Sequence, residues 1–113
     1  MHNCHLIIAD NEGDTPLHFA SAQGHLDIVK YLTLELNCDP MLTDSYHNTA
    51  LHEAARNGHL EVVKFLVKVI HCPTNVRGSC HMTPLDWAFF KGHYHVVQYL
   101  NRDHFEGVIQ KQS

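Results

Sequence analysis

Histidine and cysteine are the residues of this sequence whose chemistry stands out. There are 12 histidines and 4 cysteines among 113 residues, and imidazoles and thiolates are ligands that Zn²⁺ favours. The spacing closest to a metal site is His71-Cys72 followed by Cys80-His81. Adjacent residues rarely both reach one tetrahedral ion, and no Cys-x-x-Cys spacing occurs. The sequence therefore favours a polar turn with a structural cysteine, and predicts no metal ion and no other cofactor, with a zinc-stabilised variant as the alternative.

No catalytic residues are indicated either. An activated nucleophile needs a base within hydrogen-bond reach and a third group that orients this base. Nothing in the sequence suggests such a set, so we expect no enzymatic activity.

Five of the histidines belong to a pattern that recurs every 34 residues. It consists of an element around Thr-x-Leu and a Gly-His pair, in the three copies Asp14-Thr-Pro-Leu-His18 with Gly24-His25, Asn48-Thr-Ala-Leu-His52 with Gly58-His59, and Met82-Thr-Pro-Leu-Asp86 with Gly92-His93. A fixed period in this range indicates a stack of supersecondary units, none of which can bury its apolar face alone. We therefore expect the function on a shared surface and not in an enclosed pocket.

These repeats resemble the ankyrin repeat. The resemblance covers residues 10–100 and is carried by the Thr-Pro-Leu-His element and by Gly-His-Leu-Asp-Ile-Val-Lys-Tyr-Leu at 24–32, Gly-His-Leu-Glu-Val-Val-Lys-Phe-Leu at 58–66 and the looser Gly-His-Tyr-His-Val-Val-Gln-Tyr-Leu at 92–100. It implies an all-α repeat solenoid of stacked helix-turn-helix units with protruding β-hairpin or loop fingers. The period is one residue longer than the usual ankyrin unit, which predicts a longer connection after the second helix.

Each unit is expected to begin with a short inner helix between a threonine and a glycine. Threonine can cap a helix start, and glycine can adopt the left-handed conformation that ends a helix. The caps are Thr15, Thr49 and Thr83, and the ends are Gly24, Gly58 and Gly92. A second helix follows, whose apolar positions are expected to form the core: Leu26, Ile28, Val29, Tyr31 and Leu32, then Leu60, Val62, Val63, Phe65 and Leu66, then Tyr94, Val96, Val97, Tyr99 and Leu100.

The polar segments between units are expected to form the fingers. Asn37 and His71 occupy matching helix exits. The ankyrin pattern places a glycine in each finger, and Gly13 supplies it in the first, but His47 and His81 take its place in the other two. We therefore expect a different turn in fingers two and three.

The repeat boundaries follow from the period. Residues 1–10 align with the tail of a truncated preceding repeat, residues 11–44, 45–78 and 79–104 form repeats one to three, and residues 105–113 form a C-terminal tail. The third repeat turns polar near its end, as capping repeats do. We expect a fragment of a longer array, able to self-associate through its uncapped N-terminal repeat.

Composition limits the partners and the setting. The formal net charge is −4 without a basic block, which disfavours nucleic acid, and no apolar run is long enough for membrane insertion. Cys4, Cys38 and Cys72 share one repeat position, where a small buried side chain is favoured over a disulfide. Free cysteines in such positions fit a reducing compartment, so we expect an intracellular, cytoplasmic protein.

The resemblance also implies where a partner would bind. In ankyrin proteins the finger tips and the exposed side of the inner helices form one concave face, whose residues vary between copies. The candidate binding residues are Asn11, Glu12, Asp14, Phe19, Gln23, Ser45, Tyr46, Asn48, Glu53, Arg56, Asn57, Met82, Trp87, Phe90 and Lys91. Tyr46, Arg56 and Trp87 are of the types that dominate interface energetics. For Trp87 and Phe90 the alternative is that they complete the core of a terminal repeat.

The predicted function is that of a non-catalytic protein-protein interaction module, a scaffold or adaptor that holds a protein partner on its concave face. The alternative is a regulatory or assembly ankyrin region of a larger enzyme or channel.

Overall fold

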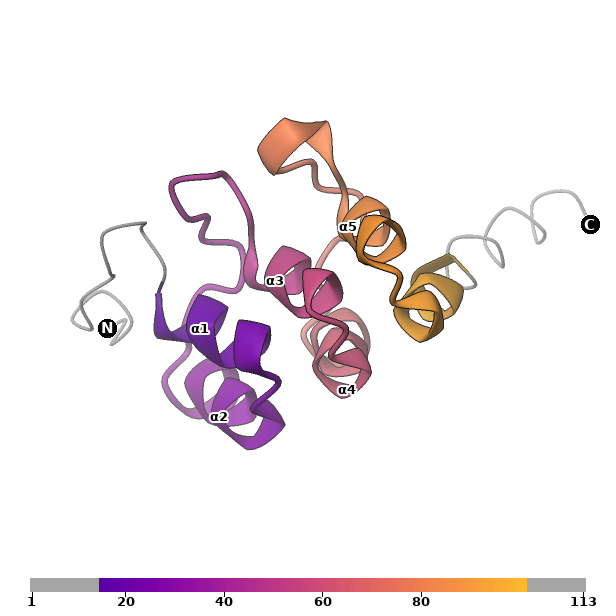
Figure 1. Ribbon diagram of the computed structural model, residues 1–113. Helices are drawn as coiled ribbons and strands as arrows, with labels where there is room; N and C mark the ends of the chain where they lie inside the picture. Colours follow the sequence, from indigo (N-terminus) through magenta and orange to yellow (C-terminus); the bar gives the residue numbers. More distant parts are fainter. Residues whose placement is uncertain (1–14, 102–113) are drawn as a thin grey trace, which may run out of the picture.

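Helices stacked in pairs make up the part of the chain that the computed structural model describes, residues 15–101. The labelled helices are α1 (Pro16–Gln23), α2 (Leu26–Lys30), α3 (Ala50–Arg56), α4 (Leu60–Lys64) and α5 (Pro84–Lys91), and residues 94–101 form a further helix. The inner helices α1, α3 and α5 lie in a row, α1 against α3 and α3 against α5 (Figure 1). The predicted all-α repeat solenoid is confirmed.

The inner helices begin as predicted, at a capping threonine. Thr49 Oγ1 accepts the backbone N–H of His52, while His52 Nδ1 accepts the backbone N–H of Thr49 at 3.0 Å. Thr15 and Thr83 form the same reciprocal box with their own third helical residues. Such a cap contributes about 1 kcal/mol, and it fixes where each inner helix starts.

A glycine follows each inner helix, and at Gly24 and Gly58 there are two reasons for it. Gly58 has a φ of 78°, which is left-handed, and a Cβ placed on it would lie 2.5 Å from Nδ1 of His93. Gly24 stands in the same relation to His59, whose Nε2 also lies 2.8 Å from the carbonyl oxygen of Ala22. The imidazole of each repeat therefore packs on the glycine of the preceding repeat, which a larger residue would prevent.

The extra residue of the 34-residue period lies inside the second helices. Their last turns are π-helical, at Tyr31–Glu35 (η2) and Phe65–Val69 (η3). Each is closed by a backbone hydrogen bond that spans five residues, at 3.2 Å in both copies. A π turn takes up one residue more than an α turn. The predicted longer connection after the helix is therefore wrong, because a widened turn accommodates the residue while its backbone groups stay paired.

Finger two (residues 37–48) and finger three (residues 71–82) are loops in the described structure, and both project to the same side of the inner helices (Figure 1). His47 has a φ of 67° and His81 a φ of 59°. Both histidines thus lie in the left-handed region that glycine favours, and the expected difference from the turn of finger one stays a prediction. Finger three differs by one further left-handed residue, Cys80, in the short 3-10 turn Ser79–His81 (η4). Gly13 lies outside the described residues.

The core runs between the two layers of helices. Its buried apolar side chains include Leu17, Val29, Leu51, Val63, Leu66, Val96 and Leu100. Three predicted core residues are instead exposed, Ile28 by 44%, Tyr31 by 55% and Tyr94 by 63%. Val62 and Phe65, the counterparts of Ile28 and Tyr31, are buried. In repeat two, the side that carries Val62 and Phe65 is covered by repeat one. In repeat one, no described residue covers the side that carries Ile28 and Tyr31.

Candidate functional site

Several predicted binding residues meet around one hollow between fingers two and three, here called the inter-finger hollow. It has a volume of about 300 Å³ and is lined by Asp44, Tyr46, Asn48, Glu53, Arg56, Ser79 and Trp87. Finger two, α3, finger three and α5 all contribute, so the hollow spans two neighbouring repeats. The repeat stack therefore brings together side chains that are far apart in the sequence.

An ion pair and an aromatic contact organise the hollow. Arg56 Nη2 lies 2.7 Å from Glu53 Oε1, because residues three apart on α3 lie on one face. The guanidinium carbon of Arg56 lies 5.7 Å from the ring centroid of Trp87, and Trp87 meets Phe90 edge to face at 6.0 Å. Arg56 is thus held between its own helix and the next repeat, and its position is set before any partner arrives.

Asp44 shapes the wall that finger two contributes. Its Oδ1 accepts the backbone N–H of Tyr46 at 2.8 Å and that of Asn48 at 3.0 Å. Asn48 Oδ1 in turn accepts the backbone N–H of Ser79 at 3.0 Å, which joins finger two to finger three. The sequence-based list of binding residues lacked Asp44. The only signal for it was its turn-forming type at a finger position.

Buried histidines tie the inner helices to the fingers. His18 Nε2 lies 2.8 Å from the carbonyl oxygen of Asn48, and His52 Nε2 lies 2.8 Å from that of Val76. Since Nδ1 of His52 accepts a backbone N–H, Nε2 carries the proton and donates. Burial lowers the pKa of His52, while the hydrogen bond to Val76 opposes the shift. His18 and His52 thus each connect an inner helix to the finger that follows it in the chain.

The other predicted binding residues fall into three groups. Phe19, Gln23, Ser45, Asn57, Phe90 and Lys91 are exposed, and Met82 is half-buried. Asn48 and Glu53 are buried, because the amide of Asn48 links the fingers and Glu53 pairs with Arg56. Asn11, Glu12 and Asp14 lie outside the described residues. Phe90 is 69% exposed and therefore does not complete a core, whereas Trp87 is half-buried at the edge of the hollow.

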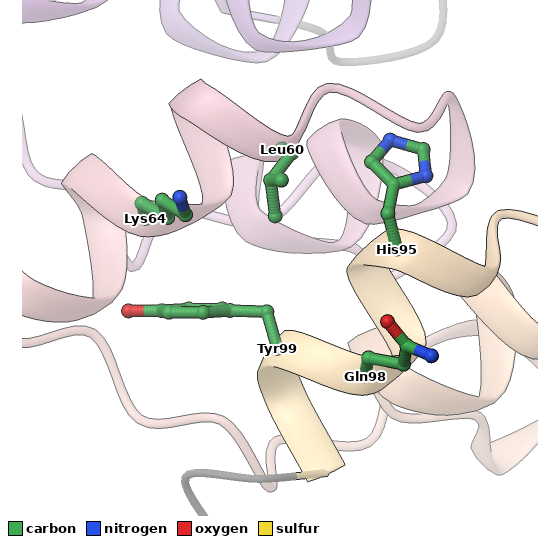
Figure 2. Close-up of a pocket in the computed structure, with 5 residues that line it drawn as sticks. All are labelled: Leu60, Lys64, His95, Gln98 and Tyr99. Atoms are coloured by element: carbon green, nitrogen blue, oxygen red, sulfur yellow. The ribbon is translucent and has the colours of Figure 1, made fainter.

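A second hollow, of about 430 Å³, lies between α4 and the helix of residues 94–101. Figure 2 shows its lining residues, Leu60, Lys64, His95, Gln98 and Tyr99. Lys64 Nζ lies 5.9 Å from the ring centroid of Tyr99, and His95 Nε2 lies 3.2 Å from the carbonyl oxygen of Gly58. These contacts join the second helices of repeats two and three, so this hollow belongs to the packing of the stack.

The histidine and cysteine pairs do not form a metal site in the described structure. The hollow beside His71 and Cys72 has a volume of about 480 Å³ and is lined by residues of 67–74 only, without Cys80 or His81. Among residues 15–101, no three His, Cys, Asp or Glu side chains are grouped to hold an ion. Burial, with help from Asp39, raises the pKa of Cys72 to about 11. Without a metal ion, Cys72 is therefore a protonated thiol at neutral pH.

The cysteines that share a repeat position differ in state. Cys72 is a free, buried thiol, whereas Cys38 is disulfide-bonded. The prediction of a free cysteine at this position is therefore wrong for Cys38. Cys38 and Cys72 occupy the same position in the repeat, which indicated equal packing, and both are buried. The shared position did not determine the bonding of the sulfur.

Stacked helix pairs with fingers on one side define a repeat solenoid that offers an open surface. A family model of ankyrin repeats (3 copies) matches residues 32–110, and one of ankyrin repeats (many copies) matches residues 1–52. The chain belongs to the ankyrin repeat family, whose repeats are generally protein-protein interaction modules. A search of curated proteins found no match. Among the described residues, no helix is long and apolar enough to cross a membrane.

Proposed function

We propose that this chain is a non-catalytic scaffold or adaptor that binds a protein partner on the face formed by its fingers and inner helices. The observation that carries the proposal is that Tyr46, Arg56 and Trp87 line one hollow across two repeats. The residues that vary between repeats thus meet in space, as expected if they contact a partner while the repeated residues hold the stack.

The mechanism is rigid presentation. The hydrogen bonds of Asp44 and Asn48 hold the fingers, and the ion pair with Glu53 holds Arg56. Because little ordering is needed on binding, more of the contact energy is available as affinity. Truncation of a central residue such as Tyr46 is expected to weaken binding by about 2 kcal/mol, or roughly 30-fold.

The proposed partner is a protein because the net charge of −4 gives no attraction for nucleic acid. For the setting, the free thiols of Cys72 and Cys80 support the cytoplasm, whereas the disulfide of Cys38 opposes it. The alternative, a regulatory or assembly region of a larger enzyme or channel, stays a prediction.

Affinity capture from a cell extract tests the proposal. The bait is compared with a triple variant of the hollow, Tyr46→Ala, Arg56→Ala and Trp87→Ala, and with a matched triple variant on the second helices, Tyr31→Ala, Lys68→Ala and Tyr94→Ala. Loss of one captured protein from the first variant alone supports the proposal. Equal capture by all three baits contradicts it. Circular dichroism checks folding, and a single Tyr46→Ala change replaces the triple variant if that variant is unfolded.

A further inference from the structure

Two carboxylates line the inter-finger hollow although their residues are almost completely buried. Glu53 is 5% exposed and Asp44 is 6% exposed. The ion pair with Arg56 uses Oε1 of Glu53, and no described residue donates a hydrogen bond to Oε2. A carboxylate has acceptor sites on both oxygens. Within residues 15–101, Glu53 thus keeps an acceptor that no donor occupies.

Asp44 has the same arrangement. Both backbone donors of finger two, the N–H groups of Tyr46 and Asn48, bond to Oδ1. The residues of the described structure supply no hydrogen bond to Oδ2. In the described part of the chain, the hollow therefore carries two carboxylate oxygens without donors, one from a finger and one from an inner helix.

The charge of the lining favours a cation. Asp44 and Glu53 are acidic and Arg56 is the one basic residue of the lining, so the sum is one negative charge in a protein of net charge −4. Arg56 is engaged by Glu53 and by the ring of Trp87. The charge of Asp44 has no such partner among the described residues. Buried negative charge attracts a cation more strongly than the same charge in bulk water.

An aromatic wall suits the stem of a long basic side chain. Tyr46 lies on the rim of the hollow and is 52% exposed. Lysine and arginine cover apolar surface with their methylene stems, and their charged groups are attracted to aromatic rings. The planar guanidinium also has several N–H donors in a fork, so one group can bond to oxygens of two carboxylates.

We propose that the inter-finger hollow binds a basic side chain, arginine above all, of the protein partner. The proposal rests on the proposed function, because it names the chemistry that the partner presents to the same face. Oδ2 of Asp44 and Oε2 of Glu53 accept from the guanidinium, and Tyr46 packs on its stem. A carboxylate is disfavoured at these two oxygens, because it has no hydrogen to donate to them.

Trp87 is the single tryptophan of the chain, so its fluorescence reports on this hollow. The probes are four peptides, acetyl-Gly-Gly-X-Gly-Gly-amide with X as arginine, lysine, glutamate or norleucine, titrated into the full chain. We expect a saturable change with the arginine peptide, and binding roughly tenfold tighter than that of the glutamate peptide. Added salt should weaken the binding, because it screens the charges.

Asp44→Asn gives a sharp test, because asparagine keeps an Oδ1 acceptor for the turn and removes the charge. We expect the affinity for the arginine peptide to fall about fivefold. The matched control is Asp39→Asn, since Asp39 also accepts a backbone N–H through Oδ1, from Met41 at 2.9 Å, but does not line the hollow. This control should bind as the native chain does.

Equal binding of all four peptides overturns the inference, and so does an affinity that Asp44→Asn leaves unchanged. Tighter binding of the glutamate peptide also overturns the inference that the hollow binds a basic side chain. If Tyr46→Ala abolishes that preference, the hollow still remains a binding site as proposed. If no peptide binds and the capture experiment still shows selective loss, the basic chemistry is wrong and the interaction face is right. If no peptide binds and capture is equal, both proposals fail.

Discussion

The histidines of this protein act as structural hydrogen-bonding residues. His18 and His52 each accept a backbone N–H through Nδ1 and meet a carbonyl oxygen of a finger through Nε2. A neutral imidazole suits both bonds, because one nitrogen accepts while the other donates. His59 packs on Gly24 of the preceding repeat. These three histidines thus serve capping and stacking, and His52 introduces a dependence of stability on pH.

Acidification should destabilise the fold through His52. Burial lowers its pKa in the folded state below the ordinary value of 6.5, so the unfolded chain binds the proton more readily. The stabilisation is fully present above the unfolded pKa and is lost as the pH falls through the lower folded pKa. For one proton the slope is at most about 1.4 kcal/mol per pH unit.

Urea unfolding at pH 7.5 and pH 5.5 measures this loss. His52→Gln is the control, because glutamine can form a capping box but does not titrate. The variant should lose less stability between the two pH values than the native chain. An equal loss in both would mean that other groups carry the pH dependence.

The two free thiols should differ in reactivity. Cys72 is buried and its pKa is raised to about 11, whereas Cys80 is exposed. Because the thiolate is the nucleophile, iodoacetamide at pH 8 should modify Cys80 first and Cys72 only on unfolding. Mass spectrometry of tryptic peptides follows both sites. Modification of Cys72 at the rate of Cys80 in the folded chain would contradict the burial of Cys72.

At the scale of the elements, local rules predicted the inner helices and the second helices that follow them, but missed the π turns in which α2 and α4 continue. The caps of Thr15, Thr49 and Thr83 and the glycine helix ends depend on a few neighbouring residues, which the sequence displays. The π turns depend on where a packed helix accommodates an extra residue, and the periodicity of the sequence does not reveal this position. The exposure of Ile28 depends on whether another repeat covers it, and the repeat pattern treats all copies as equal.

The stacking of imidazole on glycine can be separated from the backbone requirement of that glycine. Gly58→Ala introduces both a left-handed alanine and a Cβ 2.5 Å from Nδ1 of His93. Gly92 has a φ of 81° and nothing within 4 Å of its Cβ position, so Gly92→Ala introduces the backbone strain alone. We expect about 1 kcal/mol of destabilisation for Gly92→Ala and about 2 kcal/mol more for Gly58→Ala.

Urea denaturation of the two variants compares these free energies of unfolding. A shift of the His93 imidazole signals in NMR spectra of Gly58→Ala would report the displaced ring. Equal destabilisation by both substitutions would mean that the ring moves away without loss, and that stacking on glycine contributes little.

On the scale of the whole molecule, the site was predictable where it depends on variation between repeats. Tyr46, Arg56 and Trp87 differ from their counterparts in the other copies, and the stack places them around one hollow. The burial of Asn48 and the part played by Asp44 depend on hydrogen bonds within and between fingers, which spacing in the sequence does not display. Self-association through the N-terminal repeat stays a prediction, since residues 1–14 lie outside the described structure.

Because each repeat packs only against its neighbours, we can also predict how cooperatively the stack unfolds. In the described structure α3 lies between α1 and α5, so the middle repeat couples the two outer ones. Leu51 is buried in the middle repeat, and Leu85 holds the same position, half-buried, in repeat three. Leu51→Ala should cost about 3 kcal/mol and Leu85→Ala less, because a half-buried side chain loses fewer contacts.

The two substitutions should also differ in the order of unfolding. Trp87 reports on repeat three and on its contact with Arg56 of repeat two, whereas far-ultraviolet circular dichroism reports on all helices. In Leu85→Ala the weakened repeat three should unfold first, so the fluorescence midpoint in urea should fall below the dichroism midpoint. In Leu51→Ala both midpoints should fall together, because the middle repeat supports each neighbour. Coincident midpoints in Leu85→Ala would show that the coupling between repeats exceeds the stability lost from one of them, and that the stack unfolds as one unit.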